Sequence, residues 1–214
     1  MDKSLLVTRP NHDYTTIWLF HWAEGLIGEA LRRKITVVDL AGQKAILTEL
    51  EGRLRKISPD FIVLNGHGDA GTVTGQDNQP LISAGQNELL LAGSVVYAIS
   101  CDSAKELGPA AVKSGTKAYI GYTEEFVFFI DESLVSNPTN DQTAKLFLDP
   151  AYSVALSLVK GHSASAAHTK ATEMYKKTIR ELLISDRKSE NYLLPFLLAN
   201  LNRLVCLGDG QAII

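Results

Sequence analysis

The sequence predicts an α/β fold in which helices cover both faces of a mostly parallel central sheet. Apolar runs at residues 61–64 and 95–99 have the length and the β-branched and aromatic content of strands buried on both faces. Strand-like and helix-like patterns alternate over residues 5–64 with short links, an order typical of right-handed crossovers between parallel strands. The length of 214 residues fits one domain of ordinary size, so we expect residues 1–214 to form a single domain.

The first part of the chain supplies two strand and helix pairs. The expected elements are a strand at residues 5–8, a turn-rich loop at 9–13, a helix at 14–34, a strand at 35–39 and a helix at 45–57. In the first helix the apolar residues recur at three- and four-residue steps, and Asp13 or Thr15 is placed to cap it. The long apolar run at 61–64 then completes the alternation.

Past residue 66 the composition becomes polar and rich in glycine. Two short alternating runs within residues 72–82 predict a small hairpin over the rim of the sheet. The elements expected next are a helix near 87–91, the strand at 95–99, a helix at 104–114, a strand at 117–121 and an edge strand at 126–130. Residues 131–149 read as a loop or connector, with turn-forming residues at 137–141.

The carboxyl-terminal segment, about residues 152–205, is predicted to be helical, in pieces near 152–160, 163–185 and 190–205. Residues 192–205 are apolar on more than one face, which is typical of a helix buried almost all round. Pro195 suits the first turn of that helix. We favour packing within the chain over docking on another subunit, because a sheet needs cover on both faces.

Composition narrows the classes of function. Hydrophobic residues make up 45% of the chain and charged residues 21%, and the net charge of −3 offers no basic field for nucleic acid. The apolar part of the amino terminus is too short for a signal peptide. The sequence contains no run of about eighteen apolar residues, the length needed to span a bilayer. We therefore expect a cytoplasmic protein with no membrane span. The two cysteines are far apart, so a disulfide framework is not expected, and Cys206 reads as a core residue.

His67 and Cys101 each follow one of the buried strands, where open α/β sheets place their chemistry. Their separation of 34 positions is about one strand-helix-strand unit, which brings both to neighbouring strand ends. A thiolate attacks acyl carbons, and an imidazole beside it can hold and return the proton. Amides near Gly68 and Cys101 could stabilise an oxyanion. The alternative is that Cys101 is a small core residue and His67 a hydrogen-bonded loop residue.

The stretches Leu64-Asn65-Gly66-His67-Gly68 and Ala98-Ile99-Ser100-Cys101-Asp102-Ser103 resemble the caspase-like cysteine peptidases of clan CD, and look closer to the bacterial CHAT type than to animal caspases. In that clan an apolar strand leads into a His-Gly pair, and a later one leads into the nucleophilic cysteine. The resemblance, over about residues 4–185, implies a three-layer α/β/α caspase-like fold with carboxyl-terminal helices. It implies His67 as the catalytic base, Cys101 as the nucleophile and Gly68 at the oxyanion site.

The resemblance also implies a cysteine endopeptidase that cleaves a protein substrate, answers to a regulatory protein partner and serves bacterial defence or signalling. The caspase signature around the cysteine is absent, because Ser100 precedes and Asp102 follows Cys101, so a strict aspartate preference does not transfer. Arg9 lies where caspases send an arginine to the P1 carboxylate of the substrate. Four aspartates at strand ends or in the loops just beyond are instead candidates for a pocket that holds a basic P1 residue, a preference we slightly favour: Asp13, Asp39, Asp69 and Asp102.

We predict no cofactor and no metal, since no spacing such as Cys-x-x-Cys or His-Glu-x-x-His occurs. A calcium site from Asp69, Asp77 and Asp102 is a weak alternative. His12 lies near the same rim and is placed to touch substrate. Two rival functions stay open: an inactive caspase-like module for binding and assembly, and a flavodoxin-like domain that binds a small ligand. Labelling of Cys101 by a peptide-like electrophile would separate the peptidase from the inactive module.

Overall fold

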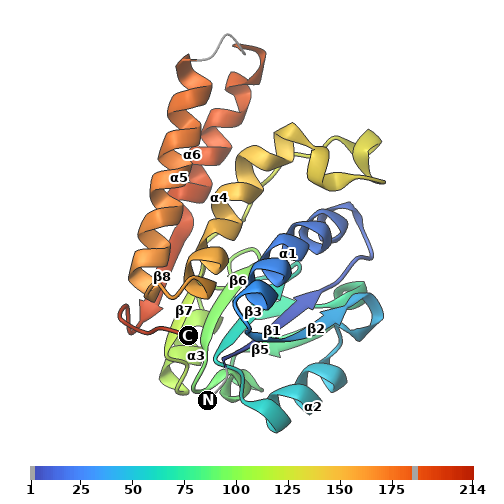
Figure 1. Ribbon diagram of the computed structural model, residues 1–214, viewed down its shortest axis with the longest axis vertical. Helices are drawn as coiled ribbons and strands as arrows, with labels where there is room; N and C mark the ends of the chain where they lie inside the picture. Colours follow the sequence, from blue (N-terminus) through green and yellow to red (C-terminus); the bar gives the residue numbers. More distant parts are fainter. Residues whose placement is uncertain (1–2, 185–187) are drawn as a thin grey trace.

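The computed structural model describes residues 3–184 and 188–214 of the chain and shows a twisted central sheet between helices (Figure 1). In sheet order the strands are β2 (Thr36–Ala41), β1 (Ser4–Arg9), β3 (Phe61–Asn65), β6 (Val95–Ile99), β7 (Ala118–Tyr122) and β8 (Leu204–Gly208). Neighbouring strands are parallel except β7 and β8, which are antiparallel. The expected mostly parallel sheet is therefore confirmed.

Helices cover both faces of the sheet. They are α1 (Tyr14–Arg32), α2 (Leu47–Ile57), α3 (Leu107–Lys113), α4 (Gln142–Val159), α5 (Ala164–Ile184) and α6 (Leu194–Arg203). Phe61 and Val63 of β3 face α1, α4, α5 and α6, whereas Ile62 and Leu64 face α2 and α3. Successive residues of a buried strand point to opposite faces, so β3 contributes to both cores. This is the predicted three-layer α/β/α arrangement.

Short elements connect these layers. The expected hairpin over the rim is formed by β4 (Thr72–Thr74) and β5 (Pro80–Ser83). The 3₁₀ turns are η1 (Gly42–Lys44), η2 (Gln76–Asn78), η3 (Glu88–Leu91), η4 (Glu132–Leu134), η5 (Pro138–Asn140) and η6 (Lys188–Leu193). The helix expected near residues 87–91 is therefore a 3₁₀ turn. Within the described ranges no helix is both long and apolar enough to cross a membrane.

The prediction of an edge strand at residues 126–130 is wrong, because that segment forms no strand. Asn200 of α6 is fully buried and takes the place of a partner strand: its Oδ1 accepts from Val127 N at 3.1 Å, and its Nδ2 donates to Val127 O at 2.6 Å. The edge of β7 is occupied instead by β8, a segment that the apolar pattern assigned to the end of a helix. Cys206 lies on this strand and is half-buried, not fully in the core.

The long connector expected at residues 131–149 is only partly correct, because α4 begins at Gln142. Asp141 is buried and caps this helix, its Oδ1 accepting from Thr143 N at 2.9 Å and Ala144 N at 3.0 Å. Pro150 lies inside α4, where proline ordinarily interrupts a helix. That residue hid the first half of α4 from the sequence pattern.

The expectation that the last helix is buried almost all round is also wrong. Leu193 and Leu197 are buried, but Leu198 is 44% exposed and Phe196 is 37% exposed. Figure 1 shows the reason: α5 and α6 pack side by side and extend past the sheet, so the sheet cannot cover the outer side of α6. Pro195 stands in the first turn of α6, as predicted.

Candidate functional site

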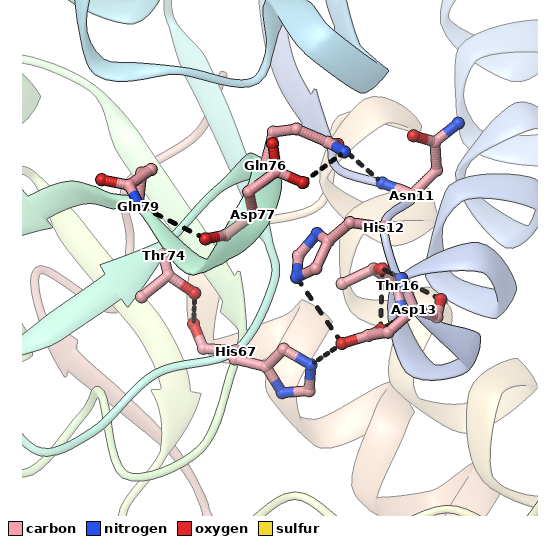
Figure 2. A network of polar contacts seen from close by, with 9 residues as sticks. All are labelled: Asn11, His12, Asp13, Thr16, His67, Thr74, Gln76, Asp77 and Gln79. Carbon is pink, nitrogen blue, oxygen red and sulfur yellow. Dashed lines mark hydrogen bonds and ion pairs between the residues drawn. The ribbon is translucent and has the colours of Figure 1, made fainter.

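The first component of the site is a carboxylate fixed at a helix start. Asp13 is the N-cap of α1: its Oδ1 accepts from Thr16 N at 2.8 Å, and Thr16 Oγ1 accepts from Asp13 N at 3.0 Å. This reciprocal cap holds the side chain and leaves Oδ2 free to face His67 (Figure 2). Burial acts to raise the pKa of Asp13, but the hydrogen bonds from Thr16 and His67 outweigh it and hold the pKa below its usual value. The group is therefore a carboxylate near neutral pH.

The second component is the imidazole of His67, just past β3. Its Nε2 lies 2.7 Å from Asp13 Oδ2, and both side chains are 37% exposed. The carbonyl of His67 accepts from Thr74 N at 2.9 Å and from Ser100 Oγ at 3.2 Å, which ties the backbone to the hairpin and to the end of β6. A carboxylate acceptor selects the tautomer with the proton on Nε2. The basic nitrogen of His67 is therefore Nδ1.

Two glycines allow this tight arrangement. A Cβ on Gly66 would lie 2.1 Å from Thr74 O, and a Cβ on Gly68 would lie 2.1 Å from Ser100 Oγ. The same position on Gly68 is 3.3 Å from Cys101 O, so the two strand-end segments lie side by side. No side chain fits at either glycine without moving the backbone.

The third component is Cys101, which is half-buried just past β6. Its thiol lies 3.8 Å from Phe126 O. Burial raises the pKa of the thiol; the hydrogen bond to Phe126 opposes this, and the charges of Glu125 and Asp102 add to the rise. At rest the nucleophile candidate is therefore a neutral thiol, which needs a base at the moment of attack.

Strand register places the segments that carry His67 and Cys101 at neighbouring strand ends. β3 and β6 pair in parallel from Phe61 opposite Val95 to Asn65 opposite Ile99, and His67 and Cys101 each follow two residues beyond the last pair. Among the described residues the thiol of Cys101 donates to Phe126 O and makes no hydrogen bond with the His67 ring. Over the same part of the chain, no oxygen accepts a hydrogen bond from the amides of Gly68 and Cys101. The candidate base, the candidate nucleophile and these two amides thus share one rim of the sheet.

Of the residues predicted to contact substrate, Arg9 is the most enclosed. Its Nε donates to Asp39 at 2.9 Å, its Nη1 donates to Phe20 O at 3.0 Å, and its guanidinium stacks over the Phe20 ring at 4.1 Å. The side chain is buried and links β1 to β2 and α1. Its hydrogen bonds are thus made within the fold.

The four aspartates are placed differently from one another, and Asp39 is already paired with Arg9. Asp13 faces His67, so its candidate role becomes orientation of the base. Asp69 closes a turn by accepting from Gly71 N at 2.9 Å. Asp102 directly follows Cys101 in a left-handed backbone conformation with a φ of 57°. Asp69 and Asp102 therefore remain the candidates for a charged substrate pocket.

Several neighbours of Cys101 were not identified from the sequence. Arg203, at the end of α6, pairs with Glu124 at 2.9 Å and donates to Glu125 O at 2.8 Å. These contacts join segments about 80 residues apart, and no local pattern signals them. A separate cavity of about 730 Å³ lies between α1, α4 and α5, and its lining includes Trp22 and Tyr152 but neither His67 nor Cys101.

Alkylation of Cys101 by iodoacetamide is expected to be slow at pH 7 and to accelerate on raising the pH beyond about 8.5, the ordinary thiol value. The thiolate is the reactive form, and a raised pKa lowers its fraction at neutral pH. Mass mapping of the labelled peptide against a free cysteine peptide measures this. A maximal rate already near pH 6 would instead indicate a preformed ion pair with His67.

The sheet order, the helices on both faces and the positions of His67 and Cys101 define a caspase-like α/β fold. The chain is similar to the crystal structure of the Arg specific cysteine proteinase gingipain R (RGPB), with a TM-score of 0.64 and 9% identity over 99% of this chain and 47% of that chain. It is also similar to the complex of Porphyromonas gingivalis RgpB pro- and mature domains, with a TM-score of 0.62 and 8% identity over 99% of this chain and 48% of that chain.

The chain thus spans about half the length of these solved proteins. No protein-family profile matches the sequence, and no curated protein matches it. At this identity the likeness shows the fold alone. The predicted caspase-like fold is therefore confirmed, while the CHAT-type assignment remains a prediction.

Proposed function

We propose that this chain is a cysteine endopeptidase in which Cys101 is the nucleophile and His67 is the general base. The observation that carries the proposal is the 2.7 Å bond between Asp13 Oδ2 and His67 Nε2, on the strand end beside the one that bears Cys101. It fixes the orientation of the imidazole and leaves Nδ1 as the nitrogen proposed to accept the thiol proton. A buried neutral thiol needs such a base.

The proposed reaction proceeds in two stages. As the Cys101 sulfur attacks the peptide carbonyl, its proton passes to His67 Nδ1, and the imidazolium is stabilised by the Asp13 carboxylate. The imidazolium then gives that proton to the departing amine, which leaves an acyl-enzyme on Cys101. A water molecule, deprotonated by Nδ1, hydrolyses the thioester and returns the free thiol. The amides of Gly68 and Cys101 are the proposed donors to the oxyanion in both stages.

Asp13→Asn is expected to lower kcat by about 10²-fold or more, because an amide does not stabilise the imidazolium or select its tautomer. Asparagine is as good an N-cap as aspartate, so α1 should keep its start and Tm should change little. Steady-state kinetics with a thermal melt measure both. An unchanged kcat would show that Asp13 serves the helix only.

For the substrate we propose a protein cleaved after a basic P1 residue. Acidic groups gather near Cys101, with Asp102 and Glu125 close enough to raise the pKa of its thiol. Arg9, the candidate for an acidic P1 residue, is already paired with Asp39. The solved gingipain R is described as Arg specific, which supports the same preference.

A peptide-library cleavage profile tests the proposed function and the P1 preference together. We expect cleavage after Arg or Lys, and loss of that cleavage in Asp102→Asn or Asp69→Asn. A peptide-like electrophile with a basic P1 residue should label Cys101 and not Cys206. A preference for an apolar P1 residue would show that Asp69 and Asp102 do not select the P1 side chain of the substrate.

The proposed setting is a bacterial cytoplasm, where one CHAT-type domain over residues 1–214 cleaves a protein in defence or signalling under control of a protein partner. The solved complex of RgpB pro- and mature domains supports the proposal of a protein partner. The same experiments exclude or support the rival function, an inactive assembly module. One observation favours that rival: apolar side chains at the outer end of α5 and α6 are exposed, including Ile184 at 84% and Tyr192 at 58%.

A further inference from the structure

A cluster of three potential metal ligands surrounds the Asp13 carboxylate. One ligand atom from each of His12, Asp13 and His67 lies within 4.8 Å of the other two. Asp13 Oδ2 is 2.7 Å from His67 Nε2 and 3.5 Å from His12 Nε2. Figure 2 shows both imidazole rings directed at one oxygen of this carboxylate. The three side chains thus converge on one point.

His12 is the unexplained member of the cluster. Its side chain is only 11% exposed, and neither ring nitrogen has a hydrogen-bond partner in the described part of the chain. Buried polar atoms almost always have a partner, so an unpaired buried imidazole calls for one. The ring is held edge-on to the His67 ring, with 6.1 Å between centroids, and the neighbouring Asn11 N donates to Gln76 Oε1 at 3.0 Å. In the described part of the chain His12 is therefore fixed in place 3.5 Å from the carboxylate without a hydrogen-bond partner.

We propose that His12, Asp13 and His67 bind one Zn²⁺ ion. Two ligands of a tetrahedral zinc ion lie about 3.3 Å apart, given bond lengths near 2.0 Å. The separations of 2.7 and 3.5 Å bracket that value, so shifts below an ångström admit the ion. Two imidazole nitrogens and one carboxylate oxygen suit zinc, whereas calcium and magnesium prefer oxygen ligands alone.

The two oxygens of Asp13 divide the work. Oδ1 holds the start of α1 through Thr16, so the carboxylate stays in place whether or not an ion is bound. Oδ2 is the oxygen that faces both imidazoles. The side chains of Asp13 and His67 are each 37% exposed, so an ion reaches the site from solvent and a water completes its coordination.

Zinc at this site would inhibit the peptidase, a consequence that rests on the proposed function. Ligation of zinc through His67 Nε2 moves the ring proton from Nε2 to Nδ1, with no net change in the protons carried by His67. Nδ1 is the nitrogen proposed to accept the thiol proton, so the base is lost while zinc stays bound. Cys101 is not a ligand and keeps its thiol. Removal of zinc by a chelator should restore the base.

Binding is tested directly on the full-length chain after chelator treatment. Titration calorimetry with ZnCl₂ should show one site, and Co²⁺ should give the visible bands of a four-coordinate ion without a thiolate charge-transfer band. His12→Gln should weaken zinc binding by at least about 100-fold, since loss of an outer-shell partner alone costs 10- to 100-fold. The matched control is His21→Gln, because His21 also faces a carboxylate, Glu24 at 3.4 Å, without a third ligand. The zinc affinities of His21→Gln and of Cys101→Ala should both equal that of the original chain.

Several results would overturn the zinc site: no binding by the original chain, equal binding by His12→Gln, or loss of binding in Cys101→Ala. A thermal melt of each variant checks that it is folded. If His12→Gln does not fold, the zinc site is tested by two other measurements: the cobalt form should lack a thiolate charge-transfer band, and Cys101→Ala should bind zinc as the original chain does. Inhibition is measured against each protein's own metal-free rate. If the chain is inactive but binds zinc through His12, the proposed peptidase activity is refuted and the zinc site stands. If the chain is active and zinc changes neither its rate nor its calorimetric signal, the zinc site is refuted and the peptidase activity stands.

Discussion

Cys101→Ala is expected to abolish peptide cleavage, with kcat lower by at least about 10³-fold. The sulfur is the atom proposed to form the acyl-enzyme, and alanine offers nothing to replace it. His67→Ala should cost a similar factor, because a neutral buried thiol cannot attack without a base. The two losses should not add in the double variant, since both residues serve one step.

The control for this experiment is Cys206→Ala. Cys206 lies on β8 opposite Ile120, is half-buried, and faces a shallow hollow beside α5 that includes His168. Its replacement should leave the rate of cleavage unchanged and shift Tm by a few degrees at most. Melts of Cys101→Ala and His67→Ala should match that of the original chain, because both residues lie on loops. Full activity in Cys101→Ala would end the proposal of a cysteine peptidase.

The rim of the sheet could be predicted from the sequence because its determinants are local. β3 and β6 are continuous apolar runs, and such runs are buried on both faces of a parallel sheet. The carboxyl ends of neighbouring parallel strands lie at the same edge of a sheet, so His67 and Cys101 were expected at one edge. Asp13 was one of two residues expected to cap the first helix for the same reason, since capping depends on the next three residues.

The partner of His67 could not be predicted in the same way. Asp13 and His67 are 54 residues apart, and their contact depends on the order in which β1 and β3 pair. From the sequence Asp13 was a candidate for substrate binding, and only the fold places its second oxygen against the imidazole. His12 was expected to touch substrate, whereas its ring is enclosed beside the same carboxylate.

The far edge of the sheet was misjudged because long-range pairing outweighs local pattern. β8 has an apolar sequence that continues the pattern of α6, yet it pairs with β7 over its whole length. That pairing leaves no edge for residues 126–130, where Asn200 instead pairs with the backbone N–H and C=O of Val127. A side chain that replaces a strand leaves no periodic signal in the sequence.

A chain that ends at Ile184 is expected to lose its cooperative thermal transition. It lacks β8, so the backbone groups of β7 from Ala118 to Tyr122 lose their partners along one side. It also lacks Asn200, which leaves both polar groups of Val127 unpaired beside the segment that carries the Cys101 partner Phe126. Circular dichroism on heating and gel filtration would show a broad, early transition and aggregation.

A point substitution separates packing from pairing in this segment. Leu197→Ala removes a fully buried side chain of α6 and should cost about 2–5 kcal/mol of unfolding free energy, with β8 still in place. Leu198→Ala, one position along and 44% exposed, is the matched control and should change stability by less than about 1 kcal/mol. If the chain ending at Ile184 instead melts cooperatively and cleaves peptides, while the full-length protein alone forms oligomers, the terminal segment serves assembly and its role in completing the sheet is refuted.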